Sequence, residues 1–137
     1  MTDCLFCKIA NHTVPSIRVY EDDIVFVMMD IFPESKGHLL IIPKTHGENL
    51  FEMDDKVLAH VIRLSKTIAK AAKNALGADG IKIVQFNGQA AGQTVFHYHM
   101  HIVPAYQGVS FKRHAGQPAD TQELQQLAEK IKTTLNT

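Results

Sequence analysis

Apolar and polar positions follow two different periods along this chain, and the shorter period predicts strands. Branched and aromatic residues in IRVYEDDIVFVMMD favour strands over 17–20 and 24–30, and the acidic cluster Glu21–Asp23 favours a turn between them. The run GHLLIIPK predicts a buried strand over 38–42. That strand should end at Pro43, because proline cannot donate to a sheet ladder.

The longer period predicts a helix over 55–76. Asp54 can cap its N-terminus and Gly77 is a natural stop at its C-terminus. Apolar residues recur at helical spacing at Val57, Val61, Leu64, Ile68, Ala72 and Leu76. At about 1.5 Å per residue such a helix is roughly 30 Å long, which is enough to cross a whole sheet.

The second half of the chain again shows patterns typical of strands, and the pattern of apolar residues becomes less clear after residue 104. IKIVQFN and TVFHYHMHIVP predict strands over 81–87 and 94–104, joined by GQAAGQ. A loop with glycine and proline follows, and then a helix over 121–134. Strands on both sides of one long helix indicate an α+β fold, with an antiparallel sheet covered on one face by that helix. We expect a single domain over 1–137, in which 105–137 forms a C-terminal tail.

The amino-acid composition argues against several classes of function. The basic and acidic residues both number 14, so the formal net charge is zero, which argues against a general nucleic-acid binder. No apolar run approaches the roughly 18 residues that a membrane span needs. The N-terminus MTDCLFCKIANHTVP lacks the basic and apolar regions of a secretory signal, so we expect a cytoplasmic protein without a membrane partner.

Three of the eight histidines alternate with apolar residues in FHYHMHIVP. Successive strand residues point to opposite faces, so His97, His99 and His101 should share the open face of the strand. Phe96, Tyr98, Met100 and Ile102 should then face the core. Polar positions that only face solvent on a strand would normally be Thr, Lys or Glu. Three alternating histidines therefore indicate metal binding or catalysis.

Two chemical interpretations remain open on the pattern alone. All three rings can bind one metal, although residues four apart on a strand are about 13 Å apart at the backbone, which strains that arrangement. Alternatively the rings divide the work between a ligand or orienting group, a nucleophile, and a phosphate contact or proton donor. Imidazole suits the second interpretation because it can be neutral and nucleophilic near pH 7, or cationic beside an anion.

The motif HYHMHIVP resembles the histidine triad (HIT) family, whose pattern is His-φ-His-φ-His-φ-φ with φ apolar. NGQAAGQTVF, MDIFPESKGHLLIIPKTH and LFCKIANHTVPSIRVYEDD also resemble that family, in the same order, over residues 4–104. The resemblance implies a Hint-like homodimeric hydrolase or transferase of purine nucleotides. In it His99 attacks the α-phosphorus, His101 contacts the phosphate and assists the leaving group, and the His97 carbonyl orients the attacking ring.

The resemblance also implies the nucleotide contacts. The loop NGQAAGQTV feeds directly into the histidine segment, and Asn87, Gln93 and Thr94 would contact phosphate or ribose oxygens. Asp30 would accept from the ribose hydroxyls; on the sequence alone it can equally be a turn residue before Pro33. The base would lie among apolar side chains at Phe6, Ile9, Met28 and Ile31.

Cys4 and Cys7 are the only cysteines, and their Cys-x-x-Cys spacing fits a metal or redox site better than a structural disulfide. A thioredoxin-type redox pair would follow a strand, and no strand is predicted before Cys4. Two thiolates supply half of a tetrahedral zinc site. Some family members complete it with two histidines at the positions of His46 and His97, so the resemblance implies structural Zn²⁺ held by these four residues. Two buried thiols without a metal are the alternative. We assign no role to His12, His38, His60 or His114.

Three functions stay in view. The first is a nucleoside phosphoramidase, or a related hydrolase that splits dinucleoside polyphosphates. The second is a module that binds nucleotide or zinc without catalysis. The third is a zinc-dependent hydrolase that uses all three triad histidines. The predicted long helix is also apolar beyond one stripe, at Leu58, Ile62, Ala69 and Ala71, which favours a two-fold dimer through this helix and the 81–87 strand.

Overall fold

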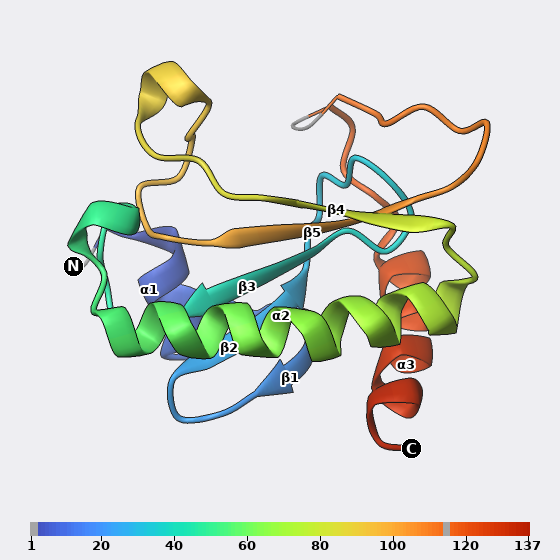
Figure 1. Cartoon of the computed structure of the whole chain (residues 1–137), viewed down its shortest axis with the longest axis horizontal. Coiled ribbons are helices and arrows are strands. Elements are labelled where there is room, and N and C mark those ends of the chain that lie inside the picture. Colours follow the sequence, from blue (N-terminus) through green and yellow to red (C-terminus); the bar gives the residue numbers. More distant parts are fainter. Residues whose placement is uncertain (1–2, 114–115) are drawn as a thin grey trace.

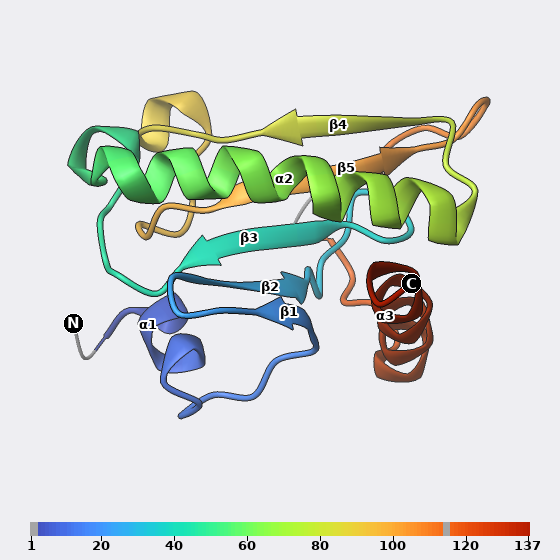
Figure 2. The same cartoon turned by 60° about the horizontal axis from the view of Figure 1, so that its bottom comes forward.

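A five-stranded antiparallel sheet organises the computed structural model, which describes residues 3–113 and 116–137. Its order is β1-β2-β3-β5-β4, so β1 and β4 are the edges (Figure 2). The strands are β1 (Arg18–Glu21), β2 (Val25–Met29), β3 (Leu39–Pro43), β4 (Gly80–Val84) and β5 (Met100–Ala105). The predicted α+β class with an antiparallel sheet is confirmed.

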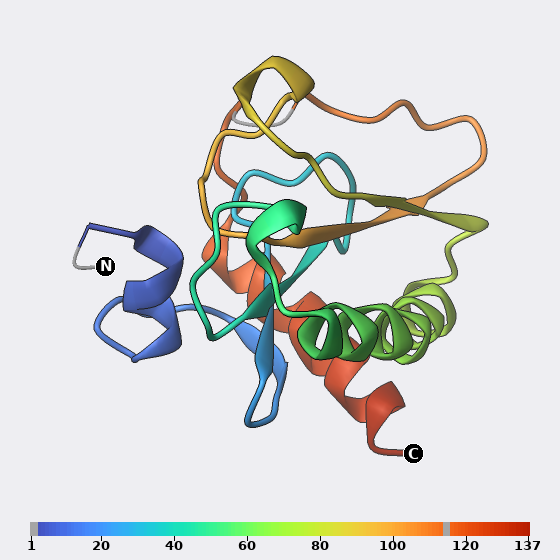
Figure 3. The ribbon, with the colours of Figure 1, turned by 60° about the vertical axis from the view of Figure 1, so that its left-hand side comes forward.

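Three helices lie around the sheet: α1 (Leu5–Ala10), α2 (Asp55–Leu76) and α3 (Thr121–Leu135). The long helix α2 crosses one face of the sheet, as predicted, and α3 packs against α2 and β1 (Figures 1 and 2). Figure 3 shows α1 on the opposite side of β2 and β3 from α2. Two short 3-10 turns, Leu50–Glu52 and Gln89–Ala91, complete the elements of the described residues.

The caps of α2 agree with the sequence. The Asp54 side chain accepts a hydrogen bond from the Lys56 amide at 2.7 Å, and Gly77 ends the helix with a φ of 66°. A positive φ suits glycine because no Cβ opposes it. Helix α1 is not among the elements predicted from the pattern, because six residues are too few for helical periodicity to show.

Each face of the sheet has its own core. The larger core lies under α2 and α3 and includes Val27, Ile41, Ile68 and Ile131, all fully buried. The smaller core lies under α1 and is formed by Phe6, Ile9, Phe26, Met28, Leu40 and Ile42. At about 25 cal/mol per Å² of apolar surface, burial on both faces is the main stabilising term. The smaller core therefore holds α1 against β2 and β3, next to the histidine segment that precedes β5.

The histidine segment differs from the prediction. Regular strand begins only at Met100, so His97 and His99 precede β5 rather than lie within a strand over 94–104. The β3–β5 register pairs Ile41 with Met100, which places Pro43 opposite Tyr98. Proline has no N–H to donate, so the ladder stops there. Tyr98, Met100 and Ile102 do join the core, but Phe96 is 44% exposed, which corrects its predicted burial.

The predicted strand over 81–87 is also too long, since β4 ends at Val84. Beyond it the Gln85 side chain donates to Asn87 Oδ1 at 2.8 Å, and this local bond begins the loop. Within the described residues no helix is both long and apolar enough to cross a bilayer.

Candidate functional site

The three triad histidines are buried rather than displayed on an open face. His97 is 0% exposed, His99 8% and His101 6%. They belong to the α1 side of the sheet, where the helix and the loop before β5 cover them. The expectation of three exposed imidazoles is therefore wrong, because α1 covers the face that the strand pattern leaves open.

The ring of His99 is oriented by its own chain. Its Nδ1 lies 2.7 Å from the carbonyl oxygen of His97. A carbonyl oxygen can only accept, so Nδ1 carries a proton and the lone pair of the neutral ring is on Nε2. Phe6 of α1 packs edge-on against this ring, with 5.0 Å between the ring centroids. The ring therefore has a fixed tautomer and a fixed plane.

A cavity of about 340 Å³ opens beside His99 and His101. Most of its wall is apolar and comes from α1, β2 and the segments that follow each of them. Its size and character suit a small organic ligand with a flat apolar part. The predicted site residues that line it are Phe6, Ile9, Met28, Asp30, Ile31, Thr94, His99 and His101.

Two predicted nucleotide contacts lie elsewhere. Asn87 and Gln93 are not among the residues that line the cavity. Asn87 Oδ1 accepts from the Leu50 amide at 2.8 Å. Gln93 is buried, accepts from the Gly88 amide at 2.8 Å and donates to the Val95 carbonyl at 3.0 Å. Both side chains thus hold the shape of the loop that leads to the histidines.

A second cluster gathers Cys4, Cys7, His46 and His97, whose ligand atoms all lie within 4.8 Å of one another. His97 Nδ1 is 3.3 Å from Cys4 Sγ, 3.6 Å from Cys7 Sγ and 3.2 Å from His46 Nδ1. Cys7 Sγ is 3.4 Å from His46 Nδ1. In tetrahedral zinc, with bonds of about 2.0 Å to nitrogen and about 2.3 Å to sulfur, ligand atoms stand roughly 3.3–3.8 Å apart. The four residues fit that ion.

A backbone hydrogen bond orients the His97 ring toward this cluster and fixes its tautomer. Its Nε2 lies 2.7 Å from the carbonyl of Pro43 and so donates its proton there, which leaves the Nδ1 lone pair directed at the sulfurs. Burial lowers the pKa of His97 to about 4, so the ring is neutral at pH 7. Burial, with a smaller effect of Cys4, raises the pKa of the Cys7 thiol above its ordinary value.

His38 is a functional candidate that the sequence analysis missed. It is fully buried, and its Nε2 lies 3.0 Å from His101 Nδ1 and 3.4 Å from Asp30 Oδ2. The same three atoms lie close enough to hold a metal ion. His38 sits two residues before Leu40, which pairs with His101, so strand register brings it to the same face. Sequence alone does not reveal that register.

The other histidines without an assigned role differ from His38. His60 Nε2 lies 2.7 Å from Asp22 Oδ2, and His12 lies 3.9 Å from Glu21, both away from the cavity. His114 falls outside the described residues.

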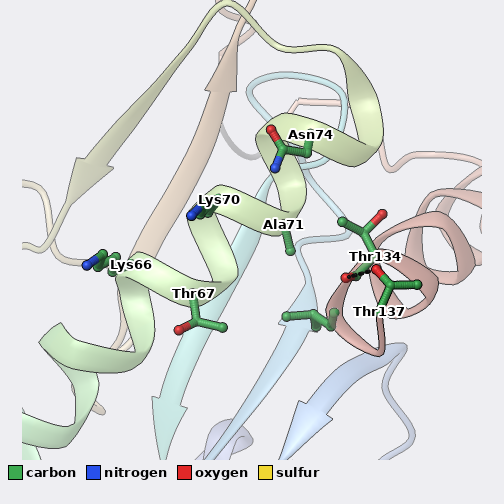
Figure 4. Close-up of a pocket in the computed structure, with 8 residues that line it drawn as sticks. Lys66, Thr67, Lys70, Ala71, Asn74, Thr134 and Thr137 are labelled. Atoms are coloured by element: carbon green, nitrogen blue, oxygen red, sulfur yellow. Dashed lines mark hydrogen bonds between the residues drawn. The ribbon is translucent and has the colours of Figure 1, made fainter.

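A further hollow, of about 400 Å³, lies between α2 and the end of α3. Figure 4 shows Lys66, Lys70 and Asn74 on α2, and Thr134 and Thr137 at the end of α3, among the residues that line it. Its lining has no histidine, cysteine or carboxylate side chain to act as a nucleophile or metal ligand. The cavity beside His99, by contrast, has two histidines and a carboxylate in its lining.

The three triad rings turn to three different partners, which disfavours one ion held by all of them. The fold and site define a small α+β protein with a histidine-lined cavity next to a Cys₂His₂ cluster. The HIT domain family model matches residues 11–108, and the chain belongs to this family.

Known relatives agree with that assignment. A Hit-like protein from Bartonella henselae, solved with an unknown ligand, superposes with a TM-score of 0.92 at 41% identity over 98% of this chain and 97% of its own. A zinc-bound histidine triad protein from Mycobacterium smegmatis gives 0.88 at 34% identity, over 98% and 94%. The adenylylsulfatase HINT3 of Arabidopsis thaliana is 42% identical over 74% of this chain and 52% of its own length.

Proposed function

We propose that the protein is a hydrolase that cleaves purine nucleoside phosphoramidates or related nucleotidyl compounds at the α-phosphorus. The observation that supports this most strongly is the 2.7 Å hydrogen bond from His99 Nδ1 to the His97 carbonyl. It sets the lone pair of a neutral imidazole on Nε2, in the wall of a cavity of suitable size. Membership of the HIT family supports the same chemistry.

The reaction would proceed in two displacements. His99 Nε2 attacks the α-phosphorus, a P–N bond to the ring forms, and the bond to the leaving amine breaks as that amine takes a proton from His101. Water then attacks the nucleotidyl-His99 intermediate and returns a proton to the His101 nitrogen that lost one. The P–N bond to the ring breaks, its electron pair returns to His99 Nε2, and a nucleoside monophosphate leaves. Splitting one difficult step into two easier ones is the advantage of covalent catalysis.

The cavity wall suggests how the nucleotide is held. Phe6, Ile9, Met28 and Ile31 would bury the base by apolar area. Asp30 would accept from the ribose hydroxyls, and Thr94 would contact the phosphate. Asn87 and Gln93 would act indirectly through the loop, because their side chains already bind backbone groups.

We also propose that Cys4, Cys7, His46 and His97 hold a structural Zn²⁺. The ligand spacing and the zinc-bound relative support this. Four protein ligands leave no open position, so the ion would supply rigidity rather than a catalytic water. Reduced thiols of this kind suit a cytoplasmic location, where disulfides are rare.

The leaving group has three candidates. A phosphoramidate amine and the nucleotide of a dinucleoside polyphosphate follow from the resemblance. The adenylylsulfatase relative suggests sulfate as the third leaving group. All three share the nucleotidyl-His99 step and differ in how strongly the leaving group needs a proton.

The test compares the wild type with His99→Ala on adenosine phosphoramidate, diadenosine polyphosphates and adenylyl sulfate. AMP release by the wild type should fall at least about 10³-fold in the variant, since loss of a catalytic nucleophile removes most of the rate enhancement. His60→Gln, remote from the cavity, is the matched control and should keep the wild-type rate. Equal release by His99→Ala would contradict the mechanism. Nucleotide binding without turnover would favour a non-catalytic module.

A further inference from the structure

One polar side chain in the wall of the cavity, that of Ser16, has no role in the proposed reaction. The other polar side chains there are assigned to the ribose or the phosphate, and they belong to Asp30, Thr94, His99 and His101. Ser16 is half-buried, and the rest of the wall around it is apolar. Apolar contacts have no direction, so a hydroxyl among them can fix how a ligand is oriented.

The strand register places Ser16 at the end of the cavity farthest from the triad. One row of paired residues crosses the sheet from β5 to β1: His101, Leu40, Met28 and Arg18. Just before β1 the Met29 amide still donates to the Ile17 carbonyl at 2.9 Å, and this pairing brings Ser16 beside Asp30. Asp30 therefore lies between the triad and Ser16. A nucleotide with its phosphate at the triad and its ribose at Asp30 would extend its base toward Ser16.

Arg18 fixes the hydrogen-bonding character of Ser16. Its Nε donates to Ser16 Oγ at 3.1 Å. A guanidinium can only donate, so the serine oxygen accepts and the hydroxyl proton points elsewhere. No residue in the described part of the chain accepts a hydrogen bond from this hydroxyl. The hydroxyl is therefore available as a donor to a ligand in the cavity.

The Arg18 side chain is itself held in one position and is only 15% exposed. Its guanidinium donates to the Ile9 carbonyl near the end of α1 and pairs with Glu21 at 2.9 Å. It also lies over the ring of Phe26, 4.5 Å from the ring centroid. Arg18 thus joins α1, the sheet and Ser16 at one point, so the serine oxygen cannot easily exchange its partner.

We propose that Ser16 is a base-reading residue, which donates a hydrogen bond to a ring nitrogen on the edge of a purine, and that Arg18 is a positioning residue that keeps the hydroxyl available as this donor. Purine rings carry acceptor nitrogens such as N3 and N7. The inference rests on the proposed function for the placement of the nucleotide, but it does not depend on the covalent step at His99.

Calorimetric binding of AMP tests the role of Ser16 without any turnover. Ser16→Ala should weaken AMP binding about 3–10-fold, which is the size of one neutral hydrogen bond. Of 1-deaza-, 3-deaza- and 7-deaza-AMP, one should bind wild type more weakly by a similar factor, because a CH group replaces its acceptor. That analogue and AMP should bind Ser16→Ala equally. Ser110→Ala, at an exposed serine outside the cavity wall, is the control and should bind like wild type.

Ribose 5-phosphate, measured by competition, separates base reading from a general change of shape. It lacks the base, so wild type and Ser16→Ala should bind it equally. Equal losses on ribose 5-phosphate and AMP would mean a purely structural role and would overturn the proposal. So would unchanged AMP binding by Ser16→Ala, a deaza penalty that persists in that variant, or a wild type that binds no AMP. The predicted binding pattern in a protein without turnover would remove the proposed hydrolase and leave this inference standing.

A double-mutant cycle tests the positioning role of Arg18. Arg18→Met keeps an unbranched apolar side chain over Phe26 and removes the hydrogen-bond donors. It should weaken AMP binding by at least as much as Ser16→Ala does, and Ser16→Ala should then cost less in this background than in wild type. Losses that simply multiply would contradict the positioning role. If urea unfolding shows that Arg18→Met does not fold, Arg18→Lys takes its place in the cycle, because lysine keeps the charge but lacks the planar fork of donors.

Discussion

At the scale of single residues, hydrogen bonds from backbone groups fix the tautomers of three imidazoles. The Pro43 carbonyl directs the His97 lone pair at the cysteines, and the His97 carbonyl directs the His99 lone pair to the opposite nitrogen. The Glu34 amide donates to His38 Nδ1, so that neutral ring carries its proton on Nε2. Main-chain groups have fixed polarity, so these tautomers follow from the fold rather than from pH.

Asp22 is the residue for which pH should change stability. It accepts from the Ile24 and Val25 amides at 2.8 Å, and its other oxygen meets Tyr20 and His60. Burial by itself would raise the pKa of Asp22, but these hydrogen bonds outweigh it and lower the pKa from 3.8 to about 2. A depressed folded-state pKa stabilises the protein above about pH 4, and this contribution is lost as the pH falls from about 4 to about 2.

We expect Asp22→Asn to lower the free energy of unfolding by about 2 kcal/mol at pH 7, because one pKa unit corresponds to about 1.4 kcal/mol. Urea unfolding at pH 7, 4 and 3 should show the difference from wild type narrowing below pH 4. The exposed Asp23→Asn is the control and should differ little from wild type at any pH. A difference for Asp22→Asn that stays constant down to pH 3 would contradict this account.

At the scale of elements, the pattern located α2, α3 and the strands, but it did not reveal α1 or the ends of the strands. Helix α2 was predicted to the residue, since its two caps and its apolar spacing agree. Strand β5 was predicted six residues too early, because Pro43 on the facing strand stops the ladder. His38 was missed for a related reason: its position beside His101 depends on the register between β3 and β5.

The Cys₂His₂ cluster joins three of these elements, since it ties α1 to the segments after β3 and before β5. Protein purified without chelator should contain about one zinc per chain, and Cys7→Ser should contain little. A ligand present at 100 times its dissociation constant stabilises the folded state by about 2.7 kcal/mol, so Cys7→Ser should unfold at lower urea. Lys8→Ser, next to it on α1, should keep zinc and stability. A wild type without zinc would contradict the site.

At the scale of the whole molecule, the surface supports the predicted two-fold dimer. Strand β4 is an edge of the sheet, and Ile83 on it is 44% exposed. Ile62 on α2 is 57% exposed, whereas Ala71, also offered as an interface residue, is buried in the core. An edge strand beside exposed apolar residues suits pairing with a second copy.

Light scattering should therefore give twice the mass of one chain. Ile62→Glu should shift the protein toward the monomer, because a charge in an apolar interface is costly to bury. Ile24→Glu, at an exposed isoleucine between β1 and β2, should leave the mass unchanged. A monomeric wild type would rule the dimer out.

The most direct test of the central claim is to catch the nucleotide on the protein. Wild-type protein mixed with a slow adenosine phosphoramidate, quenched without acid during turnover and digested, should yield one peptide that carries an added adenylyl group. Fragmentation should place that group on His99, and a chase with unlabelled substrate should release it at the rate of turnover. Turnover that continues with no adenylyl group on His99 would contradict the account.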